Sequence, residues 1–199
     1  KKQFGTILLG GGPVSDVLIA DLRELRTSVY VGYGSTETVT HVALRTLTGE
    51  QKGDVFTALG DVHFARDPRG CLVVYTPHLS VGQHVTNDLV ELVDDDRFHW
   101  LGRFDNVILS GGKKIFPEQL EAKTAGVIPY AHYFASTPDD LLGQGVLLVL
   151  ECPKDEAEVM NEVMPLLMSV LHPHELPRRV RTLPAFQRTS GGKVIRELQ

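Results

Sequence analysis

Hydrophobic residues along the chain follow two different spacings, which change near residue 50 and again near residue 104. Residues 6–9 and 28–31 form two short apolar runs. Between them, Ser15 can cap a helix in which three leucines of residues 15–25 fall on one face. This pattern predicts a strand, a helix and a strand, which is typical of an α/β fold.

The next segment, residues 51–103, alternates apolar and polar positions in short runs separated by turn residues. The runs are "GCLVVYT", "DLVELV" and "RFHWLG", and three consecutive aspartates at 94–96 are expected at the tip of a hairpin. The pattern predicts a small antiparallel β unit.

After residue 103 the pattern returns to strands and helices. "NVILSGGKKIFPEQLEAKTAG" predicts a strand, a glycine turn and a helix that starts at Pro117. "GVLLVLE" predicts a buried strand, and residues 155–171 repeat apolar positions at helical spacing, with Pro165 expected to kink or split the helix. A strand around 179–183, a glycine loop and a short last helix complete this part.

A domain boundary is therefore predicted between residues 103 and 104. The expected domains are 1–103, made of an α/β segment (1–50) and a β unit (51–103), and 104–199, a smaller α/β unit. The fold class is α/β, or α+β.

Composition favours an ordinary globular protein. Of the 199 residues, 42% are hydrophobic and 23% are charged, and the formal net charge is −5, which argues against a nucleic-acid-binding surface. No apolar run reaches the length that a membrane span needs. Two distant cysteines favour a reducing, cytoplasmic setting without a membrane anchor.

The stretch "GYGSTET" follows a predicted strand and carries groups that suit a nucleotide. Gly34 lets the backbone approach a ligand, and the Tyr33 ring can stack on a base. The Ser35 and Thr36 hydroxyls can bond phosphate, and Glu37 offers an oxygen ligand for Mg²⁺. A polar turn between strands explains the stretch equally well.

Three charged residues surround the predicted boundary. Asp88 can accept hydrogen bonds from two ribose hydroxyls, although a turn cap is the simpler interpretation. Arg103 can hold an anion or a sugar hydroxyl, and Asp105 lies where a hinge residue would have to be.

Two basic glycine turns follow. Gly111, Gly112 and Lys113 form the first, for which a solvated turn is the simpler interpretation. The second precedes Lys193 in a segment, 176–196, that contains six basic and no acidic residues and is expected to form a cationic patch for phosphates. The spacing does not match a Walker A loop. A lysine on a glycine turn can be brought to an active site by domain movement, whereas a frayed basic tail is the alternative.

In this order, the motifs resemble those of the adenylate-forming superfamily, which includes acyl-CoA synthetases, adenylation domains of peptide synthetases and beetle luciferases. "GYGSTET" resembles its adenine and phosphate motif, "TND" its TGD motif with Asn87 in place of glycine, "LGRFDNVILSGGKKIFPEQLE" its hinge motif and "RTSGGKVIR" its terminal lysine motif. "LLGGGPVS" resembles its GGxP loop, which lies beside the bound nucleotide in that family.

The resemblance implies nucleotide-binding roles. Tyr33 would stack on adenine, Thr36 would bond the α-phosphate and Glu37 would help to hold Mg²⁺. Asp88 would take the ribose hydroxyls, with Arg103 nearby. The other implied nucleotide-binding residues are Gly11, Gly12, Pro13, Gly34 and Ser35.

The resemblance also implies a mobile lid. Asp105 would be the hinge between a large N-terminal domain and a small C-terminal lid. Lys193 would be the catalytic lysine of adenylate formation, and Gly111, Gly112 and Lys113 would face the acceptor thiol after the lid rotates.

The implied activity is that of an AMP-forming acyl-CoA ligase, with ATP, Mg²⁺ and CoA. "STETVTHVALR" and the compact spacing most resemble o-succinylbenzoate–CoA ligases of menaquinone biosynthesis, in which His41 would hydrogen-bond a polar aromatic acid unless it is structural. Other aryl- or acyl-CoA ligases, an amino-acid adenylation domain and a non-catalytic nucleotide-binding module are the alternatives.

The family's Ser/Thr/Gly-rich phosphate loop is absent from these residues, as is most of the large domain. The resemblance thus implies a C-terminal fragment, whose partner is the N-terminal part of the same enzyme and which cannot adenylate a substrate by itself.

Overall fold

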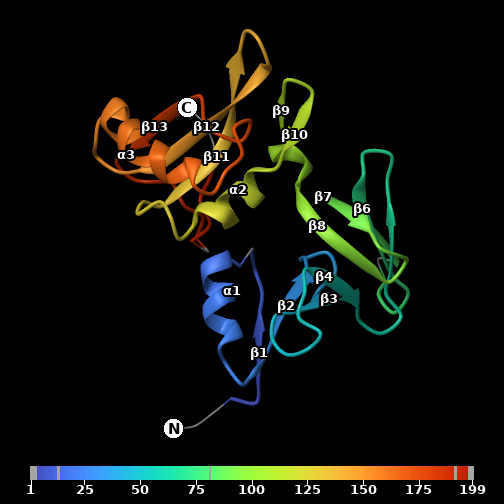
Figure 1. Cartoon of the computed structure of the whole chain (residues 1–199). Helices are drawn as coiled ribbons and strands as arrows, with labels where there is room; N and C mark the ends of the chain where they lie inside the picture. The colour runs from blue at the N-terminus through green and yellow to red at the C-terminus, as the bar shows by residue number, and fades with distance from the viewer. Residues whose placement is uncertain (1–3, 13, 81, 191, 197–199) are drawn as a thin grey trace. The chain divides into compact units, whose positions relative to one another are not determined.

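The computed structural model describes residues 4–12, 14–80, 82–190 and 192–196 (Figure 1). The chain folds into two compact units, Lys1–Asp105 (unit 1) and Asn106–Gln199 (unit 2). The boundary follows Asp105 directly. Assignment of the two units to a large domain and a lid remains a prediction.

Unit 1 is built on one eight-stranded sheet in the order β1-β2-β3-β4-β8-β7-β6-β5. Strand β1 pairs in parallel with β2, and the pairings from β2 onward along this order are antiparallel. The elements are β1 (Thr6–Leu9), α1 (Asp16–Arg23), β2 (Ser28–Gly34), β3 (His41–Thr46), β4 (Val55–Ala58), β5 (His63–Arg66), β6 (Cys71–Thr76), β7 (Gly82–Leu92) and β8 (Arg97–Arg103).

The predicted α/β segment and β unit are thus parts of a single sheet. Strand β4 joins them, because it pairs with β3 on one side and with β8 on the other. A pattern of alternating residues identifies a strand, but it contains no information about the neighbour that the strand will pair with.

Phe98 lies at the centre of the core of unit 1. Its ring is fully buried and lies 5.2 Å from the ring of Tyr33, 5.3 Å from that of Phe56 and 4.9 Å from that of Phe64, measured between centroids. Helix α1 adds Ile19 to the same core. These contacts fix Tyr33, a predicted site residue, from the apolar side.

Unit 2 contains a second sheet in the order β10-β9-β12-β11, with β13 paired in parallel to β12. Its elements are β9 (Ile108–Ser110), β10 (Lys113–Ile115), α2 (Pro117–Thr124), β11 (His132–Asp139), β12 (Gly143–Glu151), α3 (Glu156–Met168) and β13 (Arg179–Leu183), and a short 3-10 turn (Phe104–Asn106) spans the boundary with unit 1.

Strand β12 is buried on both faces, as its continuous apolar run predicted. Leu148 and Leu150 belong to the core that includes residues of α2 and α3, whereas Leu147 and Val149 pack with Tyr133 and Phe186 on the other face. A strand covered on both sides needs apolar residues at every position, which removes the usual alternation.

Helix α3 runs through Pro165 without a break, so the expected split is wrong. Val159, Val163 and Leu167 are fully buried on one face, whereas Pro165 is exposed. The helical hydrogen bond that proline removes therefore lies on the solvent side, and burial of the other face keeps the helix continuous.

Two further sequence predictions concern the ends of the fold. Residues 194–196 are not helical, and the rest of the expected last helix lies outside the described residues. No helix in the described part of the chain is long and apolar enough to cross a membrane.

Candidate functional site

The loop after β2 is held in place by its own side chains. Thr38 is buried, its hydroxyl accepts a hydrogen bond from Ser35 N at 2.9 Å, and Ser35 O and Thr40 O lie 3.1 and 3.0 Å from the same oxygen. Val39 takes a left-handed φ of 65°, which costs free energy for a β-branched residue. The loop that carries the predicted phosphate ligands is therefore preformed and strained at one position.

Gly34 is required by this loop rather than by a ligand alone. A Cβ at this position would lie 2.3 Å from Thr40 O, and at Gly32 it would lie 2.2 Å from the ring of His41. These glycines therefore permit close contact with Thr40 and His41 of the same chain. Nucleotide contact by Gly34 remains a prediction.

The three polar residues after Gly34 are exposed. Hydrogen bonds from its own backbone N–H and from the Ser35 hydroxyl lower the pKa of the Glu37 carboxyl, and His84 Nε2 lies 3.9 Å from Glu37 Oε2. Thr36 O accepts the Val39 N–H, which leaves the Thr36 side chain at the surface. An ionised, exposed carboxylate beside two hydroxyls suits a hydrated cation and phosphate.

Tyr33 and Asp88 are joined directly. The Tyr33 hydroxyl donates a hydrogen bond of 2.6 Å to Asp88 Oδ2, although 55 residues separate the two in sequence. Burial of the phenol, and then the negative charge of Asp88, raise the pKa of Tyr33 far above its ordinary value. The hydroxyl therefore remains a donor at any physiological pH.

Asp88 is positioned by its neighbours on β7 and β8. The Thr86 hydroxyl accepts a hydrogen bond from Asp88 N at 3.0 Å and donates one to Leu72 O at 2.9 Å. Across the ladder, Asp88 is paired in register with Arg103, whose Nη1 lies 4.0 Å from Asp88 Oδ1. Arg103 Nη2 in turn donates to Asp105 Oδ2 at 2.6 Å.

The structure thus brings Tyr33, Asp88, Arg103 and Asp105 into one hydrogen-bonded and ion-paired cluster. The sequence motifs predicted these residues one by one. The contact between Asp88 and Arg103 follows from the register between β7 and β8, and the Tyr33 hydroxyl reaches Asp88 from β2. No local pattern contains either pairing.

Arg69 is a member of this region that sequence reasoning missed. Its guanidinium donates to Asn87 Oδ1 at 3.0 Å and to Thr86 O at 3.2 Å, and it lies 5.2 Å from the centroid of the Phe104 ring. Asn87 stands where the TGD motif has glycine, and its side chain is hydrogen-bonded to Arg69. The turn sequence "DPRG" marked the position of Arg69 but not its contacts.

The glycine loop after β1 is partly open. A Cβ at Gly11 or Gly12 would meet nothing within 4 Å, whereas one at Gly10 would lie 2.6 Å from His41 Nε2. The His41 ring thus packs against the backbone of both Gly10 and Gly32, where it fills space between the loop and β2. Pro13 lies outside the described residues.

The first basic glycine turn is a two-residue hairpin turn between β9 and β10. Gly111 and Gly112 have φ values of 55° and 79°, and Ser110 pairs with Lys113 across the turn. Positive φ at both central positions is the signature of a type I′ turn and explains the glycine pair. Lys113 is exposed.

The second basic turn presents Lys193 to solvent. Arg188 and Val194 form a β-bridge, Thr189 N donates to Lys193 O at 2.8 Å, and Lys193 N donates to the Thr189 hydroxyl at 3.2 Å. Lys193 therefore lies on a short hairpin rather than on a frayed tail.

Half of the expected cationic patch is neutralised, so this prediction is wrong for three of the six basic residues. Arg178 pairs with Asp139 at 3.3 Å, Arg188 with Glu151 at 2.7 Å and Arg196 with Glu121 at 2.6 Å. The carboxylates come from distant parts of unit 2, so a local charge count could not predict them. Arg188 and Arg196 instead anchor the two ends of the Lys193 hairpin.

The anchor at Arg196 is partly buried. Its guanidinium also lies 4.0 Å from Glu118 and 5.7 Å from the centroid of the Tyr133 ring. Burial raises the pKa of Glu121, while the charge of Arg196 acts against this effect. Asn106, the first residue of unit 2, donates a hydrogen bond to Glu118.

Comparisons with known proteins agree with the resemblance to adenylate-forming enzymes. No protein-family model matches the chain. A 2-succinylbenzoate–CoA ligase of Oceanobacillus iheyensis is 22% identical over 98% of this chain and 45% of its own length. An acetyl-coenzyme A synthetase of Dictyostelium discoideum is 28% identical over 59% of this chain and 18% of its own length.

The similar solved structures are also adenylate-forming enzymes. An acyl-CoA synthetase (AMP-forming)/AMP-acid ligase II-like protein from Dyadobacter fermentans is 36% identical over 96% of this chain and 56% of its own, with a TM-score of 0.51. The o-succinylbenzoate CoA synthetase of Bacillus subtilis, in complex with its acyl-adenylate intermediate, is 22% identical over 96% and 45% of the two chains, with a TM-score of 0.72.

The resemblance to adenylate-forming enzymes is confirmed, and the fold is that of their C-terminal part. The chain spans less than half the length of the curated relatives described above.

We expect Tyr33→Phe to lower the stability of unit 1 by about 1–2 kcal/mol at pH 7, because Asp88 loses a donor. In the parent, stability also declines as pH rises above about 10, since the unfolded tyrosine loses its proton there and the folded one does not. The variant should lose this part of the decline, up to about 1.4 kcal/mol per pH unit. Urea unfolding followed by Trp100 fluorescence measures both effects.

Tyr75→Phe, at an exposed position of β6, is the matched control and should leave the alkaline decline unchanged. An equal decline in the parent and in Tyr33→Phe would contradict the assignment.

We expect Arg196→Met to destabilise unit 2 by about 2–3 kcal/mol at pH 7, because Glu121 is then buried without a counter-charge. Since burial raises the pKa of Glu121, this loss should grow as pH rises from about 4 and the unfolded carboxyl ionises. Urea unfolding followed by far-UV circular dichroism at pH 4 and pH 7 tests this. Arg179→Met, on the exposed side of β13, is the control and should change stability by less than about 0.5 kcal/mol. If Arg196→Met lost as much stability at pH 4 as at pH 7, Glu121 would be excluded as the cause.

Proposed function

We propose that this chain is the C-terminal part of an AMP-forming acyl-CoA ligase, and that its acid substrate is o-succinylbenzoate. The observation that carries the proposal is the cluster of Tyr33, Asp88, Arg103 and Asp105, which connects three separate motifs of the family in one fold. A chain that kept only the fold would have no need for this set of polar contacts.

Unit 1 provides the nucleotide site in this proposal. Asp88 Oδ1 receives the ribose hydroxyls, while Oδ2 stays bonded to Tyr33, whose ring borders the adenine. Thr36 bonds the α-phosphate. The lowered pKa of Glu37 supports its role as a Mg²⁺ ligand, because a cation needs the ionised carboxylate. When held there, Mg²⁺ would offset negative charge on the phosphates.

Unit 2 provides the lid, and Asp105 is the hinge. The carboxylate of the acid attacks the α-phosphate of ATP, and pyrophosphate leaves. The Lys193 ammonium stabilises the charge that develops in this step. Lys193 is exposed on a short hairpin whose ends are tied by ion pairs, which supports its use as a movable group on a rigid support.

The second half-reaction transfers the acyl group to CoA. The thiolate attacks the carbonyl carbon of the acyl adenylate, and AMP is the leaving group. Gly111, Gly112 and Lys113, on the β9–β10 turn, face the thiol in this arrangement. The closed type I′ geometry of the turn supports a fixed rather than a flexible acceptor surface.

The N-terminal part of the same enzyme is the proposed partner of unit 1. The apolar residues near the start of unit 1 are unusually exposed: Phe4, Leu8, Val17, Leu18 and Leu25. An apolar surface of this kind favours coverage by further protein. Two buried, free cysteines, Cys71 and Cys152, support a reducing, cytoplasmic setting.

We expect the isolated chain to form no acyl adenylate from ATP, Mg²⁺ and o-succinylbenzoate, because the large domain supplies the remaining phosphate contacts and most of the acyl pocket. Mass spectrometry of the products, with the complete enzyme as the positive control, measures this. Turnover by the chain alone would refute the fragment assignment. Formation of a different thioester by the complete enzyme would keep the ligase and exclude this acid, and absence of any product would favour the non-catalytic module.

In the complete enzyme, we expect Lys193→Ala to lower the rate of adenylate formation by about 100-fold or more, since it removes a charge aimed at the transition state. Thioester formation from preformed acyl adenylate should change little. Single-turnover assays of the two half-reactions separate these effects. Lys114→Ala, an exposed lysine of β10, is the control; equal losses in both half-reactions would exclude the assigned role.

A further inference from the structure

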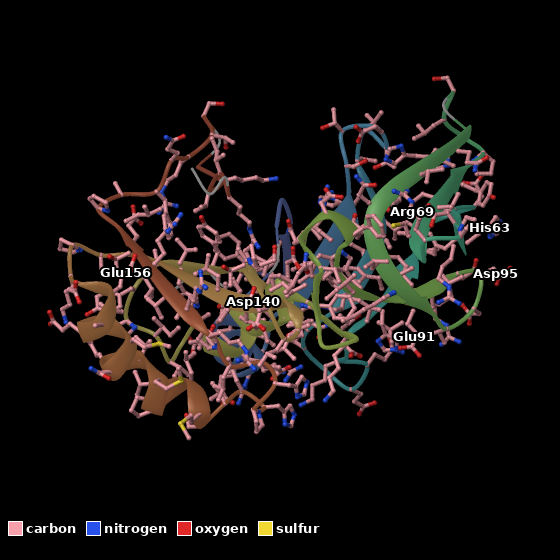
Figure 2. The ribbon with its side chains drawn as sticks, turned by 90° about the horizontal axis from the view of Figure 1, so that it is seen from above. His63, Arg69, Glu91, Asp95, Asp140 and Glu156 are labelled. Atoms are coloured by element: carbon pink, nitrogen blue, oxygen red, sulfur yellow. The ribbon has the colours of Figure 1, made fainter. Side chains whose placement is uncertain are left out.

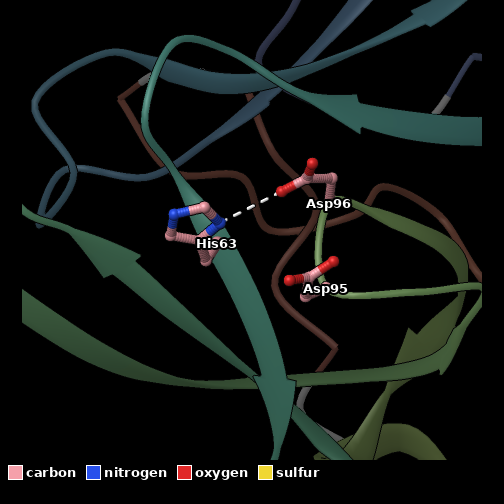
Figure 3. A group of neighbouring side chains, drawn as sticks. All are labelled: His63, Asp95 and Asp96. Carbon is pink, nitrogen blue, oxygen red and sulfur yellow. Dashed lines mark hydrogen bonds and ion pairs between the residues drawn. The ribbon is translucent and has the colours of Figure 1, made fainter.

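A second group of ligand atoms lies at the edge of unit 1, apart from the nucleotide site. His63, Asp95 and Asp96 each offer one ligand atom, and the three atoms lie within 4.8 Å of one another. Figure 2 labels His63 and Asp95 beside each other at the same edge of unit 1, and Figure 3 shows the three side chains gathered between β5 and the turn from β7 to β8. Asp88 and Leu92, where this turn begins, are four positions apart on β7, which is about 13 Å of strand.

The backbone already holds the turn against its neighbours. Phe64 N donates to Asp95 O at 2.6 Å, and Ala58 N donates to Asp96 O at 2.8 Å. The ends of β4 and β5 thus fix the positions from which the two carboxylates project. His63 comes from a different strand, so the group is not a property of the acidic run alone.

Charge in the turn is only partly compensated. Asp94 is paired with Arg97, and its other oxygen accepts the Asp96 N–H at 3.1 Å, so Asp94 serves the turn itself. The Asp96 carboxylate is 3.0 Å from His63 Nδ1. Within the described part of the chain, the carboxylate of Asp95 has no hydrogen-bond or ion-pair partner. One carboxylate beside a His–Asp pair therefore lacks a counter-charge.

The ligand atoms suit a small divalent metal ion. His63 Nδ1 and Asp96 Oδ1 lie 3.0 Å apart, the distance of a hydrogen bond, whereas two ligands about 2.1 Å from a tetrahedral metal ion lie about 3.4 Å apart, so a small movement of these exposed side chains admits the ion. Asp95 is exposed and reaches the same centre by side-chain rotation. An imidazole with two carboxylates favours Zn²⁺ or Ni²⁺ over Mg²⁺ and Ca²⁺, which prefer oxygen ligands alone.

We propose that His63, Asp95 and Asp96 form a surface site for a transition-metal ion of the Zn²⁺ class, completed by water. The ion replaces the proton between His63 and Asp96 and supplies the charge that Asp95 lacks. It ties β5, the edge strand of the sheet, to the β7–β8 turn. This proposal does not depend on the proposed ligase activity.

Zn²⁺ itself is the probe, and calorimetric titration of the purified chain is the measurement. Two other imidazoles, His172 and His174, are stacked at 5.8 Å in unit 2 and offer a competing site. The titration is therefore made in a His172→Ala/His174→Ala background. We expect one Zn²⁺ per chain and shifts of the amide signals of Phe64, Asp95 and Asp96 in nuclear magnetic resonance spectra.

His63→Ala and Asp95→Asn should each weaken Zn²⁺ binding roughly 10- to 100-fold. His99→Ala is the matched control, since His99 also contacts an aspartate, Asp54, at 3.3 Å in unit 1. It should leave the affinity unchanged. Absence of saturable binding would overturn the proposal, as would equal affinities of the parent and His63→Ala for Zn²⁺, or equal affinities of the parent for Zn²⁺ and Mg²⁺.

Discussion

The register between β7 and β8 is the constraint on which the proposed nucleotide-site cluster depends. It sets Asp88 opposite Arg103, and a shift of one residue would turn every side chain of either strand to the other face. The same ladder places Phe98 in the core, where it packs against Tyr33, so the apolar packing and the polar cluster are fixed together. Tyr33 belongs to both, with its ring in the core and its hydroxyl on Asp88.

Ion pairing separates the basic residues of unit 2 into two groups. Arg178, Arg188 and Arg196 face carboxylates of the same unit, and two of them tie the ends of the Lys193 hairpin. If these arginines were free, the tail would attract any anion. With them paired, Lys193 is an exposed charge on a rigid hairpin, which is consistent with the role proposed for it above.

The sequence predicted the local elements well, and its motifs contain residues that the fold brings together in one cluster. Strands such as β12 and the helix that starts at Pro117 follow from apolar spacing and proline position, and the motif residues follow from their type. It did not predict that β4 joins the two halves of unit 1, because pairing partners are chosen by tertiary contacts. For the same reason it missed Arg69, two of whose partners, Thr86 and Asn87, lie on the distant strand β7.

The charge pattern along the sequence gave a wrong prediction where the ion-pair partners of the basic residues are distant in sequence. A run without acidic residues predicted a free cationic patch, yet Glu121 and Glu151 reach it from α2 and β12. In the run of three aspartates, by contrast, not every charge is compensated. Its neighbour Arg97 compensates one carboxylate locally, and the fold then adds His63 from β5 beside the other two. Net charge along a sequence therefore indicates where ions can gather, but only the pairing in three dimensions decides which charges remain available to bind a ligand. In this chain that distinction assigns Arg178, Arg188 and Arg196 to the structure and leaves Lys193 and Asp95 exposed for other partners.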